Sequence, residues 1–286
     1  MTTLPHPATI YKTQKDTAAA WKKLSAHLHR GGAWRFVWTP NGGPDADRKR
    51  SVWSRLPGEL RTQTAWADRN LYFGVHPTTT DRARDDRPDY AQRSTIRTIA
   101  AVNCLFAEFD AVDLITDDEL ATVYVAPHVD GLSNAQRRKA LADADTAARS
   151  TFLAANRDRM LARTLAHVEA APVAASAVWC SGGGYQAVWL LADTVTVADD
   201  GTRDYLADLQ ARWVATVGGD DGAKDLARVL RVPGSVNRKP RYAPNYPTVD
   251  FVWCDLDRQY SLADLVAVMP AQTPSRPRRR VYARGV

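Results

Sequence analysis

Two acidic side chains at the end of an apolar run are the first residues here that could do chemistry. Residues 99–109 read IAAVNCLFAEF, and Glu108 and Asp110 stand at the end of that run on either side of Phe109. Side chains of a strand alternate between its faces, so this spacing places both carboxylates on one face. Two such carboxylates repel unless a cation lies between them, and Mg²⁺ or Mn²⁺ prefers hard oxygen ligands. The pair indicates a divalent-metal site, although with Asp113 it could equally mark the exposed end of a strand.

A run of three glycines forms the second feature with chemical potential. Gly182, Gly183 and Gly184 follow Ser181 between two apolar stretches, residues 174–179 and 185–191, which together predict a β-hairpin. Glycines let backbone N–H groups approach a phosphate closely, and Ser181 and Gln186 add polar side chains beside the turn. An ordinary hairpin turn is the alternative. A P-loop is excluded because no Gly-Lys-Ser/Thr follows.

Residues 225–239 combine one carboxylate, a Pro-Gly turn and several cations. Asp225 could complete a metal site, and Arg231 and Lys239 could hold triphosphate or template phosphates. A solvated basic turn is the alternative, in which Arg228 pairs with Asp225 three residues away. Asp220 and Asp221 lie close enough in sequence to be the third acid instead of Asp225.

Hydrophobic periodicity predicts the helices that must support these residues. Residues 16–29 form a helix with Trp21, Leu24 and Leu28 on one face and Asp16 or Thr17 as its cap. A long Ala-rich helix, with Asn134 or Ser133 as its cap, is expected to extend to about residue 169 and to break near Asn156, whereas residues 117–125 predict a weak helix or strand. Further helices are expected over residues 204–217 and, capped by Ser261, over residues 262–268.

Short apolar stretches predict the strands. Residues 35–39, 71–76 and 249–253 fit strands, a turn is expected at 40–43, and residues 78–95 fit an exposed loop. The nearly continuous apolar run at 99–109 predicts a central strand buried on both faces. Strands, hairpins and helices together indicate an α+β or α/β chain.

Composition bounds the class of protein. The chain has 286 residues, of which 45% are hydrophobic, and it carries a net charge of +6. We expect one globular domain over residues 1–270 and a Pro/Arg-rich linker or tail over residues 271–286. No membrane-spanning run or signal peptide is visible, so we expect a cytoplasmic location in a bacterial host. The cysteines lack the C-x2-C spacing of a zinc site.

In this order and spacing, the three features resemble the motifs of the archaeo-eukaryotic primase superfamily, in its phage and plasmid primase-polymerase branch. The family's first motif is an apolar strand ending in acid-x-acid, as at Glu108 and Asp110, and its second lies on a glycine-rich hairpin. Its third resembles Asp-x-x-Arg-Val-Leu-Arg-x-Pro-Gly-x-x-Asn-x-Lys, which residues 225–239 fit closely. The resemblance covers roughly residues 30–255. One departure is Gln186, which stands where the family has a His that contacts the incoming nucleotide's phosphates.

The resemblance implies an α+β fold: an RRM-like catalytic core with a mixed or antiparallel sheet and flanking helices, plus an α/β N-terminal subdomain. It implies DNA primase or polymerase activity in phage or plasmid replication, with two Mg²⁺ or Mn²⁺ ions, a single-stranded DNA template, NTP or dNTP substrates and a C-terminal helicase domain or partner. Catalysis and metal binding would fall to Glu108, Asp110 and Asp225. Nucleotide binding would fall to Ser181, Gly183, Gln186, Arg231, Asn237 and Lys239, and nucleic-acid binding to Arg228, Arg238, Arg241 and Tyr242.

Two other functions remain open from the sequence. A replication initiator that binds DNA without catalysis would explain the basic residues but gives the acid pair no purpose. A metal-dependent nuclease could use the same acids to activate water, and it predicts strand cleavage without nucleotides. The aromatic side chains of Trp34, Trp38, Tyr72 and Tyr242 would either stack on bases or pack within the protein.

Overall fold

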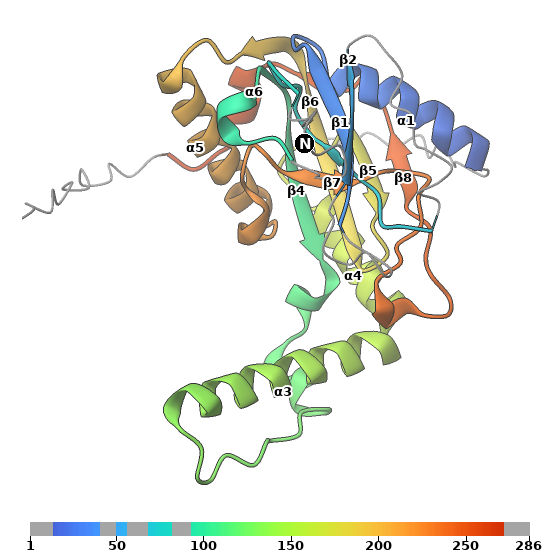
Figure 1. Ribbon diagram of the computed structural model, residues 1–286, viewed down its shortest axis with the longest axis vertical. Helices are drawn as coiled ribbons and strands as arrows, with labels where there is room; N and C mark the ends of the chain where they lie inside the picture. Colours follow the sequence, from blue (N-terminus) through green and yellow to red (C-terminus); the bar gives the residue numbers. More distant parts are fainter. Residues whose placement is uncertain (1–13, 41–49, 56–67, 82–92, 272–286) are drawn as a thin grey trace, which may run out of the picture.

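The computed structural model describes residues 14–40, 50–55, 68–81 and 93–271 (Figure 1). The predicted turn at 40–43, most of the loop expected at 78–95 and the tail from residue 272 lie outside these ranges.

Two sheets form the framework of the described residues. The first has the strand order β2-β1-β3-β7, and all of its pairings are antiparallel. Its strands are β1 (Trp34–Thr39), β2 (Arg50–Arg55), β3 (Tyr72–Gly74) and β7 (Val229–Arg231). The second has the order β4-β6-β5-β8, also antiparallel, with β9 added parallel to β6. Its strands are β4 (Ala101–Asp110), β5 (Ala177–Cys180), β6 (Gly184–Thr196), β8 (Asp250–Cys254) and β9 (Gln259–Tyr260).

Helices flank the second sheet, which confirms the expected α+β class. The helices are α1 (Gln14–Leu28), α2 (Asp117–Ala121), α3 (Asn134–Ala155), α4 (Arg157–Glu169), α5 (Asp200–Val217) and α6 (Leu262–Ala267). Caps at Ser133 and Ser261 and the break at Asn156 are confirmed. The capping prediction for α1 is wrong, because the helix begins at Gln14 and already contains Asp16 and Thr17. None of the described helices combines the length and apolar character needed to cross a bilayer.

The second sheet lies between two layers of apolar side chains. On one face, Leu105 and Ala107 of β4 join a core with residues of α4, α5 and α6, such as Trp213. On the other face, Cys104 and Phe106 join a second core with α1 and the first sheet. Since successive residues of β4 face different cores, the whole apolar run is buried, as its composition predicts.

The expected central position of this strand is wrong. Strand β4 is the end strand of its sheet and pairs with β6 on one side only, within the described residues. On its other side, the Gln210 side chain of α5 accepts from Phe106 N at 3.3 Å and donates to Phe106 O at 2.8 Å. A side-chain amide therefore takes the place of a neighbouring strand.

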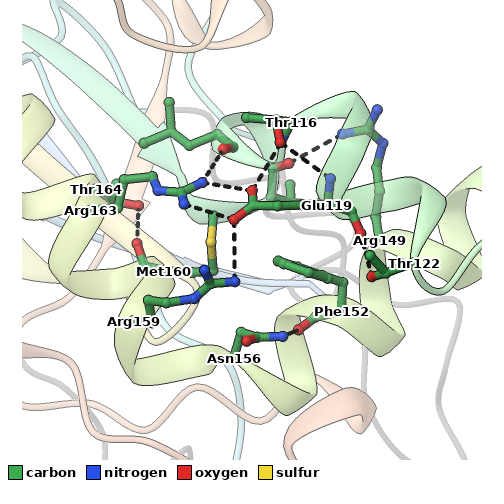
Figure 2. A network of polar contacts seen from close by, with 12 residues as sticks. Thr116, Glu119, Thr122, Arg149, Phe152, Asn156, Arg159, Met160, Arg163 and Thr164 are labelled. Carbon is green, nitrogen blue, oxygen red and sulfur yellow. Dashed lines mark hydrogen bonds and ion pairs between the residues drawn. The ribbon is translucent and has the colours of Figure 1, made fainter.

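A cluster of arginines fixes the segment that follows β4. This segment is the short 3₁₀ helix η3 (Ala111–Leu114), which leads to α2. Arg163 of α4 makes two hydrogen bonds of 2.7 Å to the Glu119 carboxylate, and Arg159 lies 3.2 Å from it (Figure 2). The Arg163 guanidinium also donates to Leu114 O at 2.9 Å, and Arg149 of α3 donates to Val112 O at 3.3 Å. This network, called the Glu119 clamp below, holds the chain beyond Asp110 against α3 and α4.

Candidate active site

Most of the predicted site residues line one pocket of about 280 Å³, at the end of β4 where the two sheets approach each other. Those lining it are Glu108, Asp110, Ser181, Gly183, Gln186, Arg228, Arg231, Asn237, Lys239 and Arg241. Asp225, Arg238 and Tyr242 do not line it. Trp38, Tyr72, Arg93 and Asp220 do. The sequence predicts Trp38 and Tyr72 only as aromatic residues that stack on bases or pack within the protein, and it predicts Asp220 only as an alternative to Asp225.

Gln186 holds the first acid in place. It lies directly across from Glu108 in the β4–β6 ladder, and its Nε2 donates to Glu108 Oε2 at 2.7 Å. Its Oε1 accepts from Trp179 Nε1 at 2.8 Å and from the backbone N–H of Arg231 at 2.9 Å. The side chain is buried and joins the two sheets. The geometry therefore gives Gln186 a positioning role toward Glu108, which the sequence pattern did not suggest.

Arg228 is the charge partner of Glu108. Its Nε donates to Glu108 Oε1 at 2.6 Å, while its Nη1 donates to Gly222 O at 3.1 Å and lies 3.8 Å from Asp225. Burial raises the pKa of Glu108, and the Arg228 guanidinium opposes that rise. The alternative pairing of Arg228 with Asp225 is thus present, but the shorter contact is to Glu108.

The third acid of the pocket is Asp220. Its backbone N–H donates to Glu108 O at 2.8 Å, on the open side of β4, which anchors the 218–223 loop beside the acid pair. The close approach depends on Gly219, where a Cβ would lie 2.9 Å from the Ala107 Cβ. Asp225 is more than half exposed, lies 3.8 Å from Arg228 and does not line the pocket. The geometry favours Asp220, and the assignment to Asp225 stays a prediction from the sequence.

The glycine turn brings the hairpin against the end of β4. A Cβ at Gly184 would lie 2.0 Å from Phe109 O, so only glycine allows this approach. Gly182 has a φ of 95°, and Ser181 closes the turn by donating from N to Gly184 O at 2.8 Å. Asn237 Nδ2 donates to Ser181 O at 2.6 Å and ties the turn to the basic run.

Two cations, the buried Arg231 and the more exposed Lys239, line the same pocket as the acids. Arg231 is 3% exposed, its guanidinium lies 4.7 Å from the Tyr72 ring centroid, and its Nη1 donates to Asn70 Oδ1 at 2.9 Å. Its Nη2 is buried and has no hydrogen-bond partner among the described residues. Burial lowers the pKa of Arg231, and burial together with Arg241 and Arg231 lowers the pKa of Lys239. An anion in the pocket would satisfy both groups, and phosphate oxygens suit a guanidinium well.

The carboxylates fit a divalent ion in chemistry, although they are not pre-assembled around one. Burial and the nearby Asp110 and Asp220 raise the pKa of Asp113, which shows negative charge gathered at this end of β4. Within the described ranges, no three or more Asp, Glu, His or Cys side chains are grouped closely enough to hold a metal ion. Each Glu108 oxygen already accepts one hydrogen bond, from Arg228 or from Gln186, so a metal ion would use a remaining lone pair or replace Arg228.

Comparison with known proteins places the chain in a family. Residues 110–275 match the family model described as RepB DNA-primase N-terminal domain. That range contains Asp110, the glycine turn and the basic run. No curated protein matches.

Three solved structures are similar at low identity. The AEP domain of the cyanophage S-2L primase-polymerase is 15% identical, with 90% of this chain and 98% of that chain covered and a TM-score of 0.47. The primase RepB′ is 12% identical, with 88% and 60% covered and a TM-score of 0.40. The RepB′ catalytic domain in complex with initiator DNA gives the same identity and TM-score, with 88% and 90% covered. Because the family model matches more than half of the chain, the chain belongs to the RepB DNA-primase N-terminal domain family.

Proposed function

We propose that this chain is a template-dependent nucleotidyltransferase, a DNA primase and polymerase of phage or plasmid replication that works by a two-metal mechanism. The observation that carries the proposal is one pocket in which three carboxylates, Glu108, Asp110 and Asp220, face the buried Arg231. Carboxylates for metal ions and a guanidinium for phosphate are the groups that phosphoryl transfer requires.

Glu108, Asp110 and Asp220 would hold the divalent ions. When bound, the ions lower the pKa of a 3′-hydroxyl and neutralise charge on the triphosphate. Gln186 keeps Glu108 at the strand end, and Arg228 balances its charge until a cation takes that place. A metal ion at Glu108 would therefore compete with Arg228 for the negative charge of this carboxylate.

The nucleotide's phosphates would lie against the cations of the pocket. Arg231 Nη2, which has no hydrogen-bond partner within the described ranges, and the Lys239 amine would bind phosphate oxygens. Ser181, Gly183 and Asn237 shape the turn beside them. Gln186 uses one amide hydrogen for Glu108, and its second remains for a phosphate oxygen.

Template DNA would lie along the basic rim. Arg241 lines the pocket, and Arg238 lies outside it, 5.4 Å from the Tyr246 ring centroid. Contacts to the phosphate backbone predict binding that weakens as salt rises.

Incorporation of labelled NTP or dNTP on single-stranded DNA, with Mg²⁺ or Mn²⁺, tests the proposal. We expect Asp110→Asn to lose roughly 100-fold or more of the rate, because metal ions supply several kcal/mol of transition-state stabilisation. Asp113→Asn, at the same strand end but outside the pocket, is the matched control and should stay close to the parent. Equal rates for Asp110→Asn and the parent would exclude the site.

The competing function is an initiator that binds DNA without catalysis. It predicts DNA binding that is indifferent to Mg²⁺ and no affinity for nucleotides. Chelation with EDTA separates the two, because synthesis would stop while DNA binding of an initiator would continue.

A further inference from the structure

Arg228 lies within reach of two carboxylates that belong to different parts of the fold. Its Nε donates to Glu108 Oε1 at 2.6 Å, and its Nη1 lies 3.8 Å from Asp225 Oδ2. The side chain of Glu108 is 18% exposed, whereas that of Asp225 is 58% exposed. One guanidinium therefore bonds to the more buried acid on β4 and lies beside a solvated acid of its own turn.

The backbone of this turn is fixed, so a change of partner needs only rotation of the arginine side chain. Val75 N donates to Arg228 O at 3.1 Å, and Arg228 N donates to Asp225 O at 3.0 Å. Leu226, which lies between them in the chain, is fully buried. The 3.8 Å from Arg228 Nη1 to Asp225 is about 1 Å longer than a charge-assisted hydrogen bond. A small side-chain movement therefore completes the second ion pair.

Asp225 is placed to accept this closer contact. Its contact with Arg228 is its one ion pair within the described residues, and it does not line the pocket. Asp221, an exposed acid of the same loop, is already paired with Lys224, whose Nζ donates to it at 2.5 Å. Of these two exposed acids, Asp225 is the one that can receive the guanidinium without giving up another cation.

We propose that Asp225 is the second partner of Arg228, and that the guanidinium turns from Glu108 to Asp225 when a divalent cation occupies Glu108. This inference rests on the proposed function, because it takes Glu108 to be a metal ligand. A cation there adds positive charge beside Arg228, in a pocket that Arg231 and Lys239 also line. The turn toward Asp225 separates these like charges and keeps the arginine paired. Asp225 is therefore a positioning residue that acts through Arg228, and not a metal ligand.

A double-mutant cycle on Mn²⁺ affinity tests this role in the full chain, without nucleotide or DNA, with free Mn²⁺ measured by electron paramagnetic resonance. We expect Asp225→Asn to weaken Mn²⁺ binding about fivefold, because the displaced guanidinium loses its second partner. Arg228→Gln should tighten binding by about the same factor, because the competitor for Glu108 is gone. In the Arg228→Gln background, Asp225→Asn should then change the affinity by less than about twofold.

Two further variants locate the ion and control for charge. Glu108→Gln should abolish the binding, which places the measured ion at this carboxylate. Asp221→Asn removes a negative charge from the same loop and leaves Asp225 in place, so its affinity should stay within about twofold of the parent. Equal losses from Asp225→Asn with and without Arg228 would make Asp225 a metal ligand and overturn the inference. No loss in either background, or weaker binding by Arg228→Gln, would also overturn it.

The parent chain itself offers a second measurement, which does not depend on how the variants fold. The NMR signal of the Arg228 Nε–H group, assigned by its loss in Arg228→Lys, should shift and exchange faster with water as Mg²⁺ is added, because its bond to Glu108 is broken. A signal that stays unchanged at saturating Mg²⁺ would mean that Arg228 keeps Glu108, and would overturn the inference.

Failure of this inference and failure of the proposed function give different results. If the parent binds Mn²⁺ at Glu108 but makes no product, nucleotidyl transfer fails as a function, and the cycle still decides the role of Asp225. If the parent makes product and the effects of Asp225→Asn and Arg228→Gln are independent, the function stands and the inference fails. A parent that binds no Mn²⁺ would overturn the inference whatever its activity.

Discussion

Glu108 is the most constrained acid of the site. Its oxygens accept from Gln186 and Arg228, and its backbone carbonyl accepts from Asp220. Burial favours the protonated acid and raises the pKa of Glu108, whereas the Arg228 guanidinium favours the carboxylate.

The assignment of the third acid can be tested with a pair of substitutions. We expect Asp220→Asn to lower nucleotide incorporation by roughly 100-fold and to raise the Mg²⁺ concentration needed for half-maximal rate, because a metal ligand is lost. Asp225→Asn should change the rate by only a few-fold, because that side chain lies outside the pocket. Metal titrations of the two variants measure the difference, and the reverse order of effects would restore the assignment to Asp225.

Individual roles were harder to predict than the residues involved. Spacing identified the acid pair, the glycine turn and the basic run, and these do meet in one pocket. Asp220 could not be separated from Asp225, because what distinguishes them is a backbone hydrogen bond between a loop and β4. The bonds that turn Gln186 toward Glu108 and Arg231 likewise depend on strand register and on contact between sheets.

Two buried glutamines support β4 from its two sides, and they allow a controlled comparison. Gln186 bonds to Glu108, whereas the hydrogen bonds of Gln210 within the described residues go only to the Phe106 backbone. We expect Gln186→Leu and Gln210→Leu each to lose about 1–3 kcal/mol of stability, because each leaves buried polar groups unpaired. Only Gln186→Leu should also lower the rate constant kcat, since only it frees Glu108. Urea unfolding with steady-state kinetics measures both, and equal kcat for the two variants would contradict a positioning role for Gln186.

The Glu119 clamp should stabilise the chain beyond the acid pair. The hydrogen bonds from Arg163 lower the pKa of Glu119 to about 2, so the carboxylate is ionised at neutral pH. We expect Glu119→Gln to lower the melting temperature and to speed amide exchange in α2, because the charge that holds Arg163 and Arg159 is removed. Asp118→Asn, in the same first turn and outside the network, is the control. Unchanged exchange in α2 would show that the apolar contacts alone hold it.

Periodicity predicted helices better than it predicted strand neighbours. The caps of α3 and α6 and the break at Asn156 follow from local chemistry, which the sequence contains. The end position of β4 was not predicted, because an apolar sequence indicates only that a strand is buried and not what covers it. Here α5 covers the strand, as a neighbouring strand could also have done. Strand β7 was missed because it has three residues inside a charged run, with Arg231 buried in it.

Two histidines lie buried around the first sheet and link folding to pH. Burial lowers the pKa of His29 to about 4 and the pKa of His76 to about 3. Both rings are therefore neutral in the folded chain, while the unfolded chain binds protons below about pH 6.5. Because the unfolded state binds more protons between those values, the free energy of unfolding must fall as pH drops below about 6.5.

Replacement of one ring tests this linkage. We expect His76→Leu to lose less stability than the parent between about pH 7 and pH 5, because one proton-binding group of the unfolded state is gone. Denaturant unfolding at both pH values gives the comparison. His128→Leu, at an exposed position, should keep the parent's pH dependence. An identical pH dependence in His76→Leu would place the linkage elsewhere.

The side-chain amide of Gln210 along β4 has a consequence for how the protein meets other chains. An end strand with unpaired N–H and C=O groups is a template on which a foreign strand can add, and this is a common route to aggregation. In β4 the backbone N–H and C=O of Phe106 that point away from β6 are hydrogen-bonded to the Gln210 side chain. The Glu108 carbonyl on the same side accepts a hydrogen bond from the Asp220 backbone N–H. Addition of a foreign strand is therefore blocked at Phe106 and Glu108, in the part of β4 that leads to the acid pair.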